Sequence, residues 1–169
     1  LIGSIIHQQV SMAAAATIHR RLRELCPRKR ITPAAILALD VPTIRSAGLS
    51  ARKAEYARGV ATAFASGELS APKLRRMSDE EVIAVLTQLK GIGRWTAEML
   101  LIFCLERPDV WPVDDLGLRK AAQLHLGANE PLSTVALTAL GERWRPHRSI
   151  ATWYLWRSLD NPIKPRVTH

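Results

Sequence analysis

The segment from Leu89 to Gly93, Leu-Lys-Gly-Ile-Gly, has residue types suited to binding a phosphate group. Two glycines separated by one residue, between two stretches of helical periodicity, permit a tight turn with positive φ angles. They also clear side chains from the backbone, so that consecutive N–H groups can face an anion where the second helix begins. Lys90 and Arg94 add positive charge on either side, and we expect Ile92 to point into the core. The segment predicts binding to nucleic-acid phosphates without sequence readout, although a plain helix C-cap would use the same glycines.

Two adjacent carboxylates, Asp114 and Asp115, stand about twenty residues after these glycines, within Trp-Pro-Val-Asp-Asp-Leu-Gly-Leu-Arg-Lys (111–120). Aspartate is a preferred helix N-cap, and both acids precede a helical stretch that begins at Leu116. A carboxylate can also stabilise a developing positive charge or activate a water molecule. The two roles are compatible, because one acid can cap the helix while its neighbour faces a pocket.

The charge balance indicates a polyanionic partner. The 169 residues carry 24 Lys and Arg against 15 Asp and Glu, which gives a formal net charge of +9 and a pI near 10.4. This excess favours nucleic acid, although a protein that is merely basic and soluble would have the same composition. Cys26 and Cys104 are too few for a disulfide framework, a zinc finger or a cysteine-ligated iron–sulfur cluster, so we expect packed thiols in a reducing cytoplasm. Without an apolar run of about 20 residues or a signal peptide, we expect no membrane contact.

Periodicity predicts an all-α fold of about nine or ten helices, because apolar residues recur at helical spacing and no convincing strand alternates. The expected helices span 1–25, 33–39, 41–47, 51–67, 79–89, 94–103, 116–126, 133 to before 146, and 147–159. Caps are expected at Thr32, Ser50, Ser78 and Ser133. The first helix has no cap, so we expect the chain to begin inside a helix or a longer protein.

Together these segments resemble the helix-hairpin-helix (HhH-GPD) superfamily of DNA glycosylases, in which a glycine/proline-rich loop and a catalytic aspartate follow the hairpin at this distance. The likeness is to the alkylation-repair branch, the 3-methyladenine DNA glycosylase II (AlkA-type) enzymes, and covers essentially the whole chain. The matching segments are Gly-Ile-Gly-Arg-Trp-Thr-Ala (91–97), Pro-Val-Asp-Asp (112–115), Trp144-x-Pro146-x-Arg148-Ser149 before Trp156, and Gln-Gln-Val-Ser (8–11). The resemblance implies one domain over 1–169, with two helical lobes and without the N-terminal β domain of some members.

Position 95 bears on the mechanism within this family. Its bifunctional members carry a lysine there, which attacks the sugar and forms a Schiff base that leads to strand cleavage. Trp95 has no nucleophile, so the resemblance implies hydrolysis without a lyase step. It also implies that Asp115, rather than Asp114, stabilises the cationic sugar as the N-glycosidic bond breaks.

The resemblance further implies a base pocket lined by rings. Trp95 and Trp156 match the family's pocket aromatics, which select cationic alkylated purines by stacking and cation–π attraction. Met99 stands one helical turn after Trp95, where a well-known relative has a tyrosine, and Trp153 stands one turn before Trp156. The tryptophans at positions 111 and 144 are expected to be packing residues.

DNA contacts are expected from several segments. Gln9 matches the wedge that fills the space left by a base flipped out of the duplex. The start of the last helix is expected to contact phosphate through its N-terminus and a guanidinium group. The expected DNA-contacting residues are Gln8, Gln9, Lys90, Gly91, Ile92, Gly93, Arg94, Thr96, Arg148 and Ser149. Backbone carbonyls of Thr87, Leu89 and Ile92 are candidates for a structural Na+ or K+, and no other cofactor is expected.

These features predict a monofunctional DNA glycosylase that flips and hydrolytically removes alkylated bases, such as 3-methyladenine and 7-methylguanine, from double-stranded DNA. We expect a cytoplasmic monomer. Two alternatives remain. A non-catalytic helix-hairpin-helix DNA-binding module would need neither Asp115 nor a ring at position 95, and a glycosylase for another lesion would differ only in the shape of its pocket.

Overall fold

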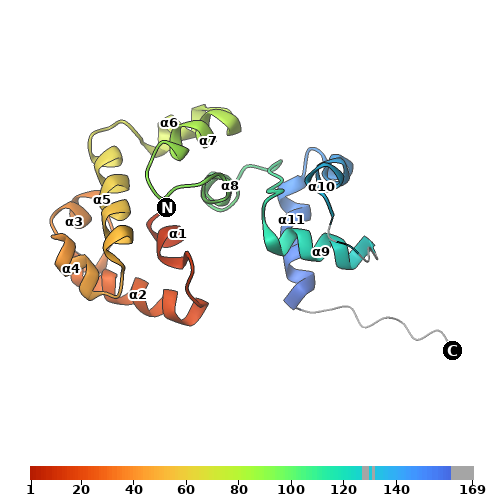
Figure 1. The fold of residues 1–169 in the computed structure, drawn as a ribbon. Helices are drawn as coiled ribbons and strands as arrows, with labels where there is room; N and C mark the ends of the chain where they lie inside the picture. The colour runs from red at the N-terminus through yellow and green to blue at the C-terminus, as the bar shows by residue number, and fades with distance from the viewer. Residues whose placement is uncertain (127–129, 131, 161–169) are drawn as a thin grey trace. The chain divides into compact units, whose positions relative to one another are not determined.

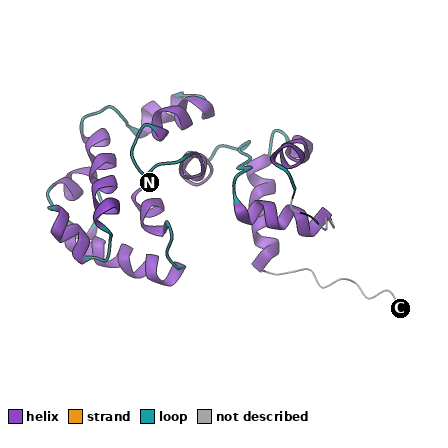
Figure 2. Ribbon diagram, in the orientation of Figure 1, coloured by secondary structure: helices purple, strands orange, loops and turns teal. Residues whose placement is uncertain are grey.

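The computed structural model describes residues 1–126, 130 and 132–160, and over these ranges it is all-α, without a β-strand (Figures 1 and 2). The elements in this part of the chain are α1 (Ile2–His7), α2 (Met12–Leu25), η1 (Pro27–Lys29), α3 (Pro33–Leu37), α4 (Val41–Ser46), α5 (Ala51–Ala65), α6 (Ala71–Arg76), α7 (Asp79–Thr87), α8 (Arg94–Phe103), α9 (Leu116–Leu126), α10 (Thr134–Gly141), η2 (Glu142–Trp144) and α11 (Arg148–Asp160). The all-α class predicted from periodicity is confirmed. Within the described ranges, no helix is long and apolar enough to span a bilayer. The tail expected to be irregular, 161–169, lies outside the described residues.

Side-chain caps determine where many of these helices begin. Each predicted cap accepts a hydrogen bond from the backbone N–H three residues on: Thr32, Ser50, Ser78 and Ser133. One helix, α6, lies outside the predicted set. Its signal is nevertheless local, since Ser70 caps it and Pro72 stands in its first turn.

The segment 1–25 is two helices, so the prediction of one continuous helix is wrong. The first helix ends at His7, because Gln8 has a non-helical ψ of 125° and Gln9 follows it with a left-handed φ of +56°. Ser11 then caps α2 through the Ala14 N–H. The apolar spacing misleads because Ile6 is fully buried whereas Val10, in the connecting loop, is 37% exposed.

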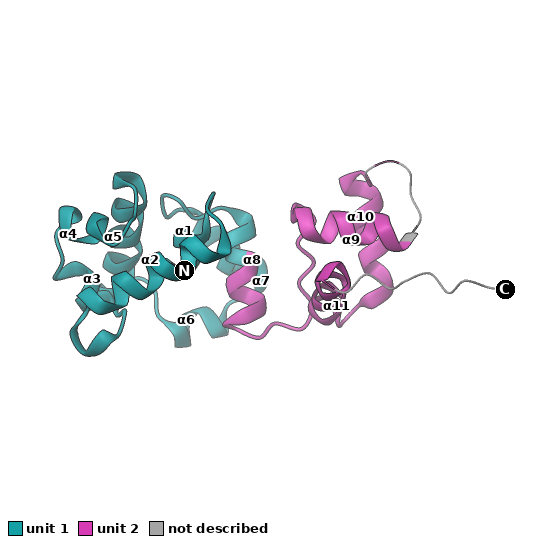
Figure 3. Cartoon of the chain, turned by 90° about the horizontal axis from the view of Figure 1, so that it is seen from below, with its two compact units in different colours: residues 1–97 teal, residues 98–169 magenta. Residues whose placement is uncertain are grey.

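Contacts between Cα atoms divide the chain into two compact units, Leu1–Ala97 and Glu98–His169 (Figure 3). In the first unit α5 packs against α1, α3 and α4. Four buried alanines of α5 keep its surface small enough for close packing: Ala54, Ala57, Ala61 and Ala63. The apolar side chains around α5 form the core of this unit and include Ile6, Leu22, Ile36 and Ile44.

In the second unit α9 packs against α11, and α10 continues into η2. Its core contains Trp111, whose indole N–H donates to the Leu137 carbonyl at 2.8 Å and whose ring lies 5.2 Å from that of Trp144. A Cβ at Gly141 would come within 2.6 Å of the Trp111 ring, so glycine is required for this packing. The packing role predicted for both tryptophans is confirmed. A single domain over 1–169 stays a prediction.

Candidate functional site

Gly91 shapes the turn between α7 and α8. Its φ is +85°, which residues with a side chain rarely adopt, and a Cβ there would collide with the ring of Tyr56 on α5. The next residue, Ile92, is buried as predicted, and its N–H donates to the Leu89 carbonyl at 3.0 Å. The hairpin is therefore fixed to the first unit by a buried isoleucine and by the close approach of Tyr56 to the backbone.

Gly93 has a different environment. Its φ is not positive, so a positive φ is found only at the first of the two hairpin glycines. A Cβ at Gly93 would meet no atom within 4 Å. The first helical hydrogen bond of α8 runs from the Ala97 N–H to the Gly93 carbonyl, so the helix itself supplies no acceptor for the N–H groups before Ala97. Open space and the positive end of the helix dipole together suit an anion.

The charged residues of the hairpin differ in how they are held. Lys90 is exposed. The Arg94 guanidinium binds both carboxylate oxygens of Glu80, at 2.7 and 3.2 Å, and holds the pKa of Glu80 below its ordinary value. Thr96 is buried, which argues against a contact between its hydroxyl and phosphate. The DNA contacts of these residues otherwise stay predictions.

The turn also has the oxygen donors that a monovalent cation takes. The Leu89 carbonyl accepts the N–H of Ile92 and, like any carbonyl, has a second lone pair. With the carbonyls of Thr87 and Ile92, it is compatible with a bound Na+ or K+, which stays a prediction.

The loop that carries Gln8 and Gln9 is tied to the hairpin. The Gln8 amide Nε2–H donates to the Gly91 carbonyl at 2.9 Å. The Lys53 ammonium donates to the carbonyls of Ile6 and Gln8, at 2.9 and 2.5 Å, and burial lowers the pKa of Lys53. Gln9 is exposed on this fixed loop, in its left-handed conformation. The geometry is compatible with the predicted wedge.

Asp115 lies at the N-terminus of α9 and is 9% exposed. Its Oδ1 accepts the Leu118 backbone N–H at 2.6 Å and the Trp156 indole N–H at 2.7 Å. Asp114, by contrast, has a side chain 62% exposed, 3.6 Å from the Arg119 guanidinium. The two acids therefore do not divide these roles, because Asp115 is both the helix cap and the buried carboxylate.

Two residues near Asp115 were not among the predicted site residues. Phe103, on α8, stacks on Trp156 with ring centroids 5.9 Å apart and planes at 19°. Gly117, in the first turn of α9, would bring a Cβ within 3.1 Å of both Asp115 Oδ1 and Trp156 Cδ1. A sequence signal exists for Phe103, since positions 95, 99 and 103 repeat every four residues and share a helix face.

The other predicted pocket residues are less closely tied to Asp115. Trp95 belongs to the first unit and is 39% exposed, whereas Met99 belongs to the second and is half-buried. The Trp153 ring packs edge-on against the Tyr154 ring, with ring centroids 5.1 Å apart. The Arg157 guanidinium carbon lies 5.9 Å from the centroid of the Trp153 ring. Their part in a base pocket stays a prediction.

The side-chain contacts expected from Arg148 and Ser149 to phosphate have no support in the structure. The Arg148 guanidinium binds the Asp109 carboxylate, at 2.6 and 3.0 Å, and lowers the pKa of Asp109. The Ser149 hydroxyl donates to the Arg107 carbonyl and accepts the Val110 N–H. Both side chains thus fix the segment before Asp115 to the start of α11.

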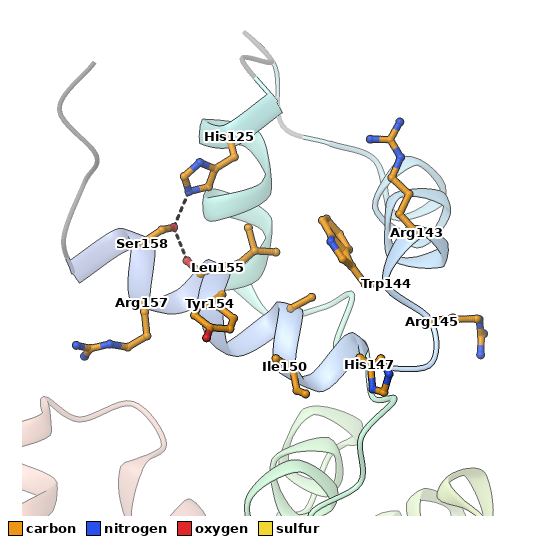
Figure 4. A pocket seen from close by; sticks show the side chains of 11 residues that line it. His125, Arg143, Trp144, Arg145, His147, Ile150, Tyr154, Leu155, Arg157 and Ser158 are labelled. Atoms are coloured by element: carbon orange, nitrogen blue, oxygen red, sulfur yellow. Dashed lines mark hydrogen bonds between the residues drawn. The ribbon is translucent and has the colours of Figure 1, made fainter. Parts of the chain in front are cut away.

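The second unit also has an apolar hollow of about 760 Å³, lined from α9, η2 and α11 (Figure 4). Ile150, Tyr154 and Leu155 form part of its wall, with His125 and Arg143 among its basic residues. These positions lie on a different face of α11 from Trp156, and none of the predicted site residues lines the hollow. The hollow is therefore separate from the Asp115 cluster.

Comparison with known proteins gives consistent matches. Residues 2–146 match the family described as HhH-GPD superfamily base excision DNA repair protein. The chain is 38% identical to DNA-3-methyladenine glycosylase 1 of Schizosaccharomyces pombe, over 98% of the chain and 76% of that protein. It is 26% identical to DNA-3-methyladenine glycosylase 2 of Escherichia coli, over 92% of the chain and 55% of that protein. A solved S. pombe 3-methyladenine DNA glycosylase in complex with abasic DNA superposes with a TM-score of 0.86, at 37% identity over 94% of this chain and 78% of that one.

Proposed function

Because the chain belongs to the HhH-GPD superfamily of base excision DNA repair proteins, we propose that it is a DNA glycosylase that removes alkylated bases by hydrolysis, without lyase activity. The observation that carries this proposal is the Asp115 carboxylate, buried at the start of α9 and held by two N–H donors. The relatives named as 3-methyladenine DNA glycosylases support the glycosylase activity, and their named substrate supports the class of base.

The chemistry follows from the charge that develops on the sugar. When the N-glycosidic bond breaks, the departing base leaves positive charge on the deoxyribose. A carboxylate that is shielded from water and fixed in position stabilises this charge more strongly than a mobile, solvated one. Asp115 meets both conditions, and the same carboxylate can orient or deprotonate the attacking water.

Rings near Asp115 suit a cationic leaving group. Phe103 is 57% exposed and stacks on Trp156, so this pair presents an aromatic surface beside the carboxylate. An alkylated purine carries positive charge, which an aromatic face attracts. The positive charge also makes the alkylated purine a good leaving group, so bond cleavage needs little help from a general acid.

Residue 95 supports the absence of a lyase step. A lyase reaction through a Schiff base needs an amine close to the sugar, and the indole of Trp95 cannot form a Schiff base. We expect the hairpin around Gly93 to contact the DNA backbone, and the net charge of +9 supports binding to a polyanion.

The test is release of 3-methyladenine and 7-methylguanine from methylated double-stranded DNA. Asp115→Asn should slow single-turnover release by roughly 100- to 1,000-fold, the effect of losing one key electrostatic group. Asp114→Asn is the matched control, because that side chain faces solvent, and it should retain nearly the wild-type rate. The reverse pattern would contradict the assignment of Asp115.

Two further arms separate the alternatives. Borohydride should trap no covalent DNA adduct, and a trapped adduct would overturn the hydrolytic mechanism. A panel with oxidised and deaminated bases tests the lesion class. DNA binding without release of any base would instead identify a non-catalytic DNA-binding module.

A further inference from the structure

We propose that Trp156 is a positioning residue for Asp115, and that Gly117 provides the space this requires. The inference rests on the proposed function, because it assigns Trp156 a role in the reaction through the carboxylate. It differs from the pocket role expected from sequence, in which the indole only contacts the base.

The first observation is that Asp115 Oδ1 lies between two donors from different helices. The Leu118 N–H belongs to the first turn of α9, and the Trp156 indole N–H belongs to α11, 41 residues later in the chain. Their distances to Oδ1 are 2.6 and 2.7 Å, in the range of charge-assisted hydrogen bonds. A carboxylate bound by one backbone donor can still rotate about its Cβ–Cγ bond, whereas a second donor from another direction restricts that rotation.

The second observation is the space around Gly117. A Cβ there would lie 3.1 Å from Asp115 Oδ1, 3.1 Å from Trp156 Cδ1 and 3.3 Å from Trp156 Nε1. Any side chain would therefore press directly on the two groups that form the hydrogen bond. Glycine lowers helix propensity at this position, and the contact between Trp156 and Asp115 explains its presence.

The third observation is the stacking of Phe103 on the Trp156 ring. The stack contacts the indole face while the hydrogen bond holds its edge, so the ring is restrained in two directions. The indole is thus a fixed donor, whose effect on the reaction passes through the position of the carboxylate.

A double-mutant cycle tests this on the full chain. Trp156→Phe keeps a ring for stacking but removes the N–H, and should slow single-turnover release roughly 10- to 100-fold, as expected for one hydrogen bond to a charged group. The loss should be the same for 3-methyladenine and for the uncharged base hypoxanthine. In an Asp115→Asn background the substitution should change the rate less than about two-fold, because its effect depends on the carboxylate. Additive losses, or a loss confined to the cationic base, would overturn the proposal.

Gly117→Ala provides an independent variant that keeps every ring and donor. It should slow release about ten-fold with an unchanged affinity for abasic DNA, whereas Gly59→Ala, whose Cβ would meet no atom within 4 Å, should change neither. Equal rates for Gly117→Ala and wild type would contradict the role of that glycine.

A spectroscopic readout separates this inference from the proposed function. The Trp156 indole N–H resonance, assigned among the five tryptophans by ¹⁵N labelling, should move on Asp115→Asn because a neutral amide is the weaker acceptor. An unchanged resonance would overturn the hydrogen bond itself. If wild-type protein releases no base, the proposed function fails, and the resonance still reports whether Trp156 holds Asp115.

Discussion

Alanine at each of the two hairpin glycines should separate folding from DNA binding. Gly91→Ala places a side chain at a φ of +85°, which costs about 1–2 kcal/mol for an L-residue. Its Cβ also collides with the Tyr56 ring, and overpacking of this kind costs about 1–3 kcal/mol. The free energy of unfolding should therefore fall by about 2–5 kcal/mol, a large part of a typical domain's stability.

Gly93→Ala should behave differently, because its methyl group enters open space and its φ is not positive. Replacing glycine by alanine just before the helix should cost less than about 1 kcal/mol. The methyl group stands where an anion would approach α8, however. Loss of one charge-assisted hydrogen bond to phosphate should weaken DNA binding roughly 10- to 100-fold.

Urea unfolding followed by tryptophan fluorescence measures the stabilities, and fluorescence anisotropy with a short duplex measures affinity. Adding Tyr56→Ala to Gly91→Ala should cost less than the sum of the single changes, because the collision disappears while the strain at φ remains. Gly59→Ala in α5 is the matched control and should raise stability by about 0.5–1 kcal/mol without changing DNA affinity. Equal stability of Gly91→Ala and Gly93→Ala, or wild-type DNA affinity for Gly93→Ala, would refute the reasoning.

Three further substitutions test the charged contacts. Asp109→Asn should lower the free energy of unfolding at pH 7 by about 1–2 kcal/mol, because the Arg148 guanidinium depresses the pKa of this carboxyl in the folded state. The stability that this ion pair contributes is present above the ordinary pKa of 3.8 and is lost as the pH falls further. Urea unfolding at pH 7 and at pH ~3 should therefore show that the difference in stability between the variant and the wild type shrinks at the lower pH. A difference that stays constant would contradict this role of Asp109. Glu80→Gln removes the carboxylate paired with Arg94 and should tighten DNA binding a few-fold, with a steeper dependence of the affinity on salt concentration. A salt titration measures this dependence, and an unchanged slope would exclude Arg94 from the phosphate contacts. Lys53→Met removes the donor to the carbonyls of Ile6, in α1, and Gln8, just after it, and should speed backbone hydrogen exchange between α1 and α2. Unchanged exchange would show that this segment does not depend on Lys53.

Features that depend on a few adjacent residues could be predicted from the sequence. The caps at Ser50 and Ser78 depend on a hydroxyl and a backbone N–H three residues away, and both were confirmed. The turn at Gly91 and the burial of Ile92 likewise depend on short-range geometry. The break after α1 was missed because the apolar spacing continues through Val10, although Val10 is exposed in the loop between α1 and α2.

Contacts between distant segments could not be predicted in this way. Nothing in the residues around Asp115 indicates that its Oδ1 accepts an indole N–H from 41 residues away, or that one acid both caps α9 and is buried. The same applies to Arg148, which looked suited to bind phosphate but binds Asp109 within the protein. A guanidinium has the same donors for either partner, so only the fold decides between them.

The use of Asp115 as a helix cap has a genetic consequence. Asparagine caps helices about as well as aspartate, and a single nucleotide change converts one codon into the other. Such an allele would encode a protein that still folds and still binds DNA backbone but has lost its carboxylate. If Asp115 acts as proposed, the product would be an inactive protein that still occupies lesions, rather than an unstable protein that the cell degrades.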